Sequence, residues 1–359
     1  MNSGHRRRIG IAGAVAGVGA AGVGAAVGAR HLLVGRVRLR PDPDRGEPFG
    51  RLRGRPLAIT ADDGLPLHVE TEGPDDAPLT IVFCHGYTLT QHTWHYQRRD
   101  LAGVPGVRLV FWDQRSHGRS GRSDLANATI DQTGADLYTV LRATVPRRGR
   151  VVLVGHSMGG MSILALAERH PELFGRQVAG VVLVNTSAGD LREMTLGLPL
   201  VLAKVLRPLA PGALRGLGRR AALVDRARGL GADLAFVVTR RMAFADKHVS
   251  PTVVDFLEQM IRACPIDVIA EFYPALMAHD KADALPVLAK VPVAVLTGGQ
   301  DRLTPAVHGR RIAQALPDAE LTEIEMAGHV LPLEYPGVVT GAVRRLVERV
   351  RAEPKEKSA

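Results

Sequence analysis

A serine stands between two glycines where an apolar strand gives way to a helix, in RVVLVGHSMGGMSILALAERHP (residues 150–171). On such a tight turn, Gly155 and Gly159 permit a strained backbone that lifts the Ser157 side chain above the sheet. The helix that follows points its free N–H groups and its dipole at negative charge forming on an acyl oxygen. The pattern indicates a serine nucleophile, or else a glycine-rich helix start without chemistry.

An acid and a histidine follow later strands. Asp301 comes after an apolar strand in TGGQDRLTP, and His329 lies past the next strand in EMAGHVLPLEYP. Because parallel strands end at one edge of a sheet, residues far apart in the chain can converge with the serine there. Asp190, Asp280 and Asp283 are other acids that could reach the histidine. We expect Asp301, since only it follows an apolar strand through a Gly-Gly turn.

The segment FCHGYT ends another strand with His85 and Gly86. Glycine at this point lets the chain turn, so that the backbone N–H of Tyr87 can join that of Met158. Two converging amides of this kind form an oxyanion hole, which stabilises the negative charge of a tetrahedral intermediate. Unsupported by the serine, the same His-Gly pair would be an ordinary turn.

A further polar segment, DQRSHGRS (residues 113–120), closes the next strand. Polar residues at a strand end belong either to a site or to the loops that support one. We expect Asp113 and Arg115 to brace the loops behind the serine rather than to take part in the chemistry.

Short apolar runs alternate with helical stretches from residue 56 onward, which predicts an α/β fold with a mostly parallel sheet covered on both faces by helices. The first two runs flank the turn ADDG and should pair as a hairpin. About a hundred residues with helical periodicity lie between the sixth and the seventh apolar run. This segment is too long for a loop, so we expect a helical cap there. The predicted strands are 56–60, 67–72, 79–84, 107–113, 151–155, 180–185, 291–299 and 319–326.

Over residues 56 to about 350 these segments resemble the α/β-hydrolase family, and His156 before the serine is similar to its lipase and esterase branch. The resemblance implies Ser157 as nucleophile, His329 as base and Asp301 as the acid that orients it, with no cofactor and no metal. It implies hydrolysis of carboxylic esters through an acyl-enzyme. Thioester, amide or perhydrolytic chemistry would use the same residues, and a non-catalytic binding protein would keep the fold.

The predicted cap is rich in apolar residues, as in LGLPLVLAKVLRPLAPGALRGLG and DLAFVVTRRMAFA. Such segments carry more apolar residues than one buried helix face needs, so we expect some to line a pocket for an apolar, lipid-like ester. The same residues could instead pack the cap onto the sheet. Arg240 and Arg241 would suit an acidic substrate.

Charge and length set the remaining expectations. Residues 1–60 hold eleven arginines and three acids, so 8 of the 10 net positive charges lie there, and the nearly neutral remainder argues against nucleic-acid binding. Residues 9–29 are uncharged and follow Arg6, Arg7 and Arg8, which fits an uncleaved anchor, a cleaved export signal or a disordered tail. We expect a membrane-associated or exported protein, with the side of the membrane undecided, and no obligate protein partner.

The predicted organisation follows from these boundaries. The parts are a membrane anchor or export signal (1–30), a flexible basic linker (31–55), the first part of the core (56–187), the cap (188–287), the second part of the core (288–352) and a tail (353–359).

Overall fold

The computed structural model describes residues 40–191 and 232–352, with side chains from residue 236 onward in the second range. The predicted leader at 1–30, the tail at 353–359 and the first part of the predicted cap lie outside the described residues. Among the described helices, none is both long enough and apolar enough to cross a membrane.

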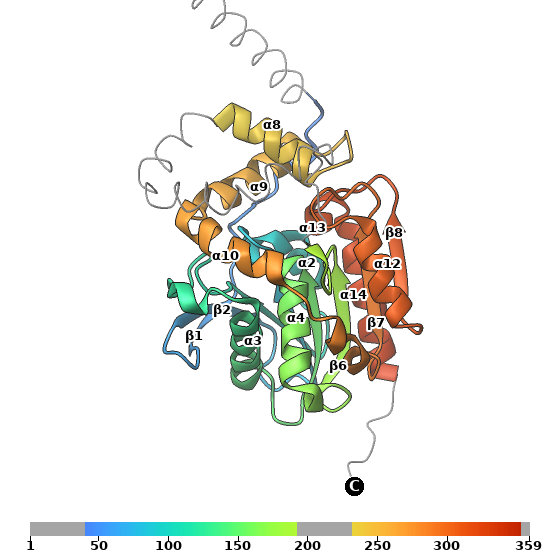
Figure 1. Ribbon diagram of the computed structural model, residues 1–359. Coiled ribbons are helices and arrows are strands. Elements are labelled where there is room, and N and C mark those ends of the chain that lie inside the picture. Colours follow the sequence, from blue (N-terminus) through green and yellow to red (C-terminus); the bar gives the residue numbers. More distant parts are fainter. Residues whose placement is uncertain (1–39, 192–231, 353–359) are drawn as a thin grey trace, which may run out of the picture.

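One sheet forms the centre of the molecule (Figure 1). Its strands are β1 (Arg55–Thr60), β2 (Pro66–Glu72), β3 (Leu79–Cys84), β4 (Val107–Trp112), β5 (Arg150–His156), β6 (Val178–Val184), β7 (Val293–Gly298) and β8 (Glu320–Ile324). Their spatial order is β1-β2-β4-β3-β5-β6-β7-β8. β2 pairs antiparallel with both β1 and β4, and every other neighbouring pair is parallel. The predicted eight-stranded, mostly parallel sheet and its opening hairpin are confirmed.

Helices cover both faces of the sheet. The described α-helices are α2 (His95–Leu101), α3 (Ile130–Thr144), α4 (Met158–Arg169), α8 (Ala232–Ala243), α9 (Pro251–Ala263), α10 (Ile266–Ala278), α11 (Leu285–Leu288), α12 (Ala306–Ala315), α13 (Leu331–Glu334) and α14 (Pro336–Ala352). Buried residues of α3, α4, α11 and α12 share one apolar core with one face of the sheet. Those of α2 and α14 share a second core with the other face. Both faces of the sheet are covered by apolar side chains, which is why the central strands are continuous apolar runs.

The helices α8, α9 and α10 lie together at one end of the sheet (Figure 1). They fall within the predicted cap, and we call them the described cap helices. Their buried apolar residues form two clusters with core residues, one around α8 and α9 and the other around α10. The cap as a whole stays a prediction, because its first part lies outside the described residues.

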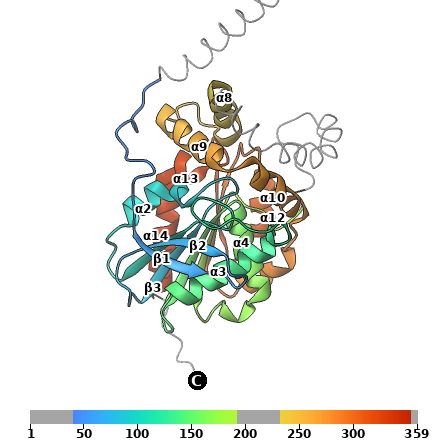
Figure 2. The same cartoon turned by 90° about the vertical axis from the view of Figure 1, so that its left-hand side faces the viewer.

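Residues 40–54, which we call the strap, pack against the fold, although the sequence predicts a flexible linker over 31–55. In Figure 2 the strap runs from the described cap helices past α2. The Phe49 ring stacks on Phe256 of α9 with centroids 4.6 Å apart. Asp42 accepts a hydrogen bond from Thr252 Oγ1 at 2.6 Å. Further polar contacts join the strap to α2, from Asp44 to Tyr96 and from Glu47 to His95 and Arg99.

Candidate active site

The turn from β5 into α4 holds Ser157 in a strained conformation. Its φ is 51° and its ψ is −118°, a backbone region that residues with side chains rarely occupy. The flanking glycines are required by close packing. A Cβ at Gly159 would lie 2.1 Å from the Cys84 carbonyl oxygen, and one at Gly155 would lie 2.6 Å from the Gly160 nitrogen. The small residues therefore let α4 start directly against β3 and β5, which fixes the serine above the sheet edge.

The structure brings Ser157, His329 and Asp301 into one hydrogen-bonded chain. Ser157 Oγ lies 3.0 Å from His329 Nε2, and His329 Nδ1 lies 2.8 Å from Asp301 Oδ2. The carboxylate also accepts hydrogen bonds from the backbone N–H groups of Leu303 (2.7 Å) and Thr304 (2.9 Å). Held by these donors, the carboxylate orients the histidine with Nδ1 toward the acid and leaves Nε2 directed at the serine, whose proton it can accept.

The other acids that the sequence offered do not make this contact. Asp190 pairs with Arg311 at 2.9 Å and its side chain is 67 % exposed. Asp280 lies beside Gly189, where a Cβ would come 2.7 Å from its carboxylate. Within residues 40–191 and 232–352, no group of three or more His, Cys, Asp or Glu side chains is arranged to hold a metal ion.

Two backbone amides beside the serine are available to an oxyanion. Neither the Tyr87 N–H nor the Met158 N–H donates a hydrogen bond to a described residue. Met158 is the first residue of α4, so its N–H also lies at the positive end of that helix. The two amides therefore have the free donors that an oxyanion hole requires.

A buried histidine fixes the peptide that carries the Tyr87 amide. Burial lowers the pKa of His85 to about 4, so its ring is neutral at pH 7. Its Nδ1–H donates to the Gly86 carbonyl at 2.7 Å, and its Nε2 accepts the Gln114 backbone N–H at 2.9 Å. Since the Gly86 carbonyl and the Tyr87 N–H belong to one peptide plane, holding the carbonyl also directs the amide.

Asn185, at the end of β6, connects the loops of the acid and the base. Its side-chain amide donates to the carbonyl oxygens of Gly328 and His329, each at 2.7 Å, and accepts the Gly298 N–H at 2.8 Å. Its own carbonyl accepts the Thr304 hydroxyl at 2.9 Å. The residue has a φ of 44°, which asparagine tolerates better than most residues. One buried side chain thus joins the carboxyl ends of β6, β7 and the loop after β8.

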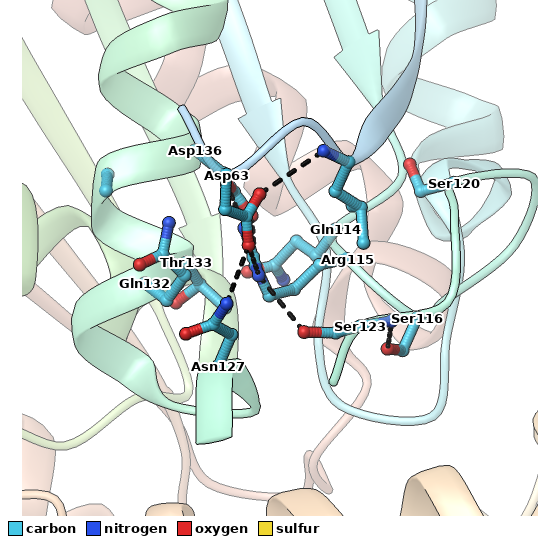
Figure 3. A network of polar contacts seen from close by, with 12 residues as sticks. Asp63, Gln114, Arg115, Ser116, Ser120, Ser123, Asn127, Gln132, Thr133 and Asp136 are labelled. Carbon is cyan, nitrogen blue, oxygen red and sulfur yellow. Dashed lines mark hydrogen bonds and ion pairs between the residues drawn. The ribbon is translucent and has the colours of Figure 1, made fainter. Parts of the chain in front are cut away.

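The loop after β4 is held by buried polar contacts. Arg115 is fully buried and forms a two-pronged ion pair with Asp136 of α3, with both N···O distances 2.7 Å (Figure 3). It reaches Asp63 in the β1–β2 turn at 2.8 Å. Asp113 accepts the backbone N–H groups of Gln91 and Arg119. These contacts tie Arg115 to α3 and the β1–β2 turn, and Asp113 to the backbone of the two loops that follow β3 and β4.

The described cap helices contact the loop of the base directly. The His329 N–H donates to the carbonyl of Ala243, the last residue of α8, at 2.8 Å. The buried Glu334 carboxylate accepts the N–H of Gly328 at 2.6 Å and those of Ala245 and Asp246 at 2.7 Å each. The segment after α8 is therefore hydrogen-bonded, directly and through Glu334, to the loop that carries His329.

Comparison with known proteins identifies the family of the chain. The chain is 26% identical over 297 residues to the 3-oxoadipate enol-lactonase 2 of Acinetobacter baylyi, covering 81% of this chain and 96% of that protein. Among solved structures, a thermophilic esterase from Thermogutta terrifontis matches with a TM-score of 0.64 and 25% identity, over 82% of this chain and 98% of that one. The enol-lactonase from Burkholderia xenovorans LB400 matches with a TM-score of 0.62 and 25% identity, over 82% and 99%. The model of the alpha/beta hydrolase family matches residues 81–342, and the chain belongs to that family.

Proposed function

We propose that this protein is a serine hydrolase that cleaves carboxylic esters through an acyl-enzyme. The observation that carries the proposal is the unbroken chain from Ser157 Oγ through His329 to Asp301. His329 Nε2 takes the serine proton while Oγ attacks the ester carbonyl, and the amides of Tyr87 and Met158 receive the oxyanion. His329 then returns the proton to the leaving alcohol. A water molecule deprotonated by the same nitrogen hydrolyses the acyl-enzyme.

Labelling with a fluorophosphonate probe tests whether the serine is activated, because the probe reacts only with a serine whose proton a base removes. We expect the full chain to be labelled and Ser157→Ala to be unlabelled. The same substitution should lower ester turnover by roughly 10⁴ to 10⁶, since only binding and the oxyanion hole remain. Labelling of Ser157→Ala, or near wild-type turnover by it, would remove Ser157 from the mechanism. Absence of both labelling and ester turnover in the full chain would favour a non-catalytic binding protein.

We further propose that the substrate is an ester with a substantial apolar part. Support comes from two apolar clusters on either side of the triad. One joins Met158, next to the nucleophile, to Phe272 and Leu276 of α10. The other joins Val330, next to the base, to residues of α8 and α9 such as Phe236. Helices this apolar beside the reacting atoms favour acyl chains over charged groups.

A chain-length series of p-nitrophenyl esters tests this second proposal on the full chain. Each methylene buried with the substrate contributes roughly 0.8 kcal/mol, so kcat/KM should rise steadily from acetate to acyl chains of about eight carbons. A preference for acetate with no turnover of the octanoate would contradict an apolar acyl site. A preference for esters with a carboxylate in the acyl part would favour recognition by Arg240 or Arg241 instead.

We propose, from its sequence, that the leader holds the enzyme at a membrane or directs its export. Arg6, Arg7 and Arg8 precede the uncharged residues 9–29, the arrangement of an anchor or a signal. Extraction of membranes with alkaline carbonate, followed by N-terminal sequencing of the mature protein, separates the two forms. A full-length protein found entirely in the soluble fraction would contradict both.

A further inference from the structure

The Tyr87 side chain leaves the core and reaches α10. Its hydroxyl donates a hydrogen bond to the backbone carbonyl of Ile269, a residue 182 positions away in the chain. Both residues pack on the apolar cluster that includes Met158, so α10 contacts the two residues whose amides would hold the oxyanion. Burial raises the pKa of this phenol, which keeps it protonated and able to donate.

The backbone around Tyr87 needs support from its surroundings. Thr88 has a φ of 63°, a left-handed conformation that is unfavourable for a β-branched residue. A Cβ at Gly86 would lie 2.8 Å from His156 Nδ1, so the chain passes close to the turn of the nucleophile. Strained segments of this kind keep their geometry only where neighbouring contacts hold them. The His85 ring holds the carbonyl of Gly86, and the hydrogen bond from the phenol to α10 holds Tyr87.

The helix that receives the phenol is fixed to the core by ion pairs as well as by packing. Arg122, in the loop after β4, lies 3.1 Å from Asp267 and 2.7 Å from Glu271. Both acids belong to α10. These ion pairs join α10 to the loop after β4, and the Tyr87 phenol joins the same helix to the segment that carries the Tyr87 amide.

We propose that the Tyr87 hydroxyl is a positioning group for the reaction: it sets the direction of the Tyr87 amide through α10, so that the described cap helices help to build the oxyanion hole. The proposal rests on the proposed function, because it assigns a role within the acyl transfer. If the Tyr87 amide moves by a fraction of an ångström, its hydrogen bond to the substrate oxygen weakens. The weakening is largest in the transition state, where the negative charge on that oxygen is greatest. Removal of the hydroxyl should therefore lower kcat and leave KM nearly unchanged.

Tyr87→Phe is the direct test, because it removes one oxygen atom and keeps the amide and the ring. Loss of a hydrogen bond that positions a donor should cost less than loss of the donor itself, which costs about 10²-fold or more. We expect a kcat about tenfold lower, with KM within about twofold of wild type. The inhibition constant of a trifluoromethyl ketone, whose adduct carries an oxyanion, should rise by the same factor as kcat falls.

Tyr273→Phe is the matched control. Tyr273 lies on α10, is half-buried like Tyr87, and its hydroxyl has no hydrogen bond to a described residue. Loss of that hydroxyl should leave kcat and the inhibition constant unchanged. Equal kinetics for Tyr87→Phe and wild type would overturn the positioning role, whereas a wild-type protein without esterase activity would overturn the proposed function.

A double-mutant cycle tests the link from α10 to the amide a second time, and its single variant Arg122→Gln leaves Tyr87 unchanged, which covers the case in which Tyr87→Phe is poorly folded. Arg122→Gln weakens the attachment of α10 to the core and should lower kcat several-fold in the wild-type background. In the Tyr87→Phe background it should have no further effect on kcat, because the link from α10 to the amide is already absent. Additive effects of the two substitutions would contradict the proposal.

Discussion

Replacement of Asn185 by glycine should destabilise the fold and disable the site together. Glycine fits the φ of 44°, so the substitution tests the loss of the side chain rather than backbone strain. It deprives the buried Gly298 N–H of its acceptor and the Gly328 carbonyl of its donor, while the His329 carbonyl keeps the His156 ring at 2.9 Å. Two buried groups left unpaired cost about 1–3 kcal/mol each, and glycine adds up to about 1 kcal/mol of unfolded-state entropy.

The free energy of unfolding should therefore fall by about 2–7 kcal/mol, a large share of the roughly 5–15 kcal/mol typical of a native protein. Urea denaturation at pH 7, monitored by circular dichroism, measures the free energy of unfolding. The rate of fluorophosphonate labelling reports the reactivity of Ser157 in the folded fraction. Asn127→Gly is the control, because its side-chain amide makes one hydrogen bond, an exposed one to Asp63 at 2.9 Å. A loss below about 1 kcal/mol for Asn185→Gly, with labelling at the wild-type rate, would refute the reasoning that these bonds hold the two loops.

Two further predictions follow from packing and burial. Gly159→Ala should prevent folding, because its methyl would lie 2.1 Å from the backbone oxygen of Cys84, whereas Gly337→Ala, with nothing within 4 Å, should melt like wild type in circular dichroism. Burial lowers the pKa of His85 and of His279 to about 4, below the 6.5 of a free histidine, so the unfolded chain binds more protons between these values. Stability should fall as the pH drops from 6.5 toward 4, by about 1.4 kcal/mol per pH unit for each such histidine. Urea midpoints that stay constant from pH 6.5 to 5 would contradict this.

The strands and the triad were predictable because their signals are local. A buried parallel strand is a continuous apolar run, and the residue that follows it lands at the sheet edge whatever the rest of the chain does. Ser157 and Asp301 each follow such a run, while His329 follows the more exposed edge strand β8, and all three lie past the carboxyl ends of parallel strands. The predicted strand ends differ from the observed ones by only a few residues, as in 291–299 against β7 at Val293–Gly298.

The supporting contacts were not predictable, because they join residues that are distant in the chain. Asn185 follows GVVLV as Asp113 follows VRLVFW, so a polar residue after a buried strand was a visible signal. Its role depends on a backbone carbonyl and a backbone N–H that are each more than 100 positions away, which nothing in the local pattern indicates. The strap illustrates the same limit. A stretch rich in arginine, proline and glycine is typical of a linker, and only the fold shows that Phe49 and the acids around it have partners in α2 and α9.

The strap also places a boundary for variation during evolution. The contacts described above begin at Asp42. An insertion or deletion between Asp42 and Phe49 would change the spacing at which these two residues reach Thr252 and Phe256 of α9. Exchange of the preceding segment keeps that spacing only if the junction falls before the strap. The enzyme begins, in this sense, about fifteen residues earlier than its first strand.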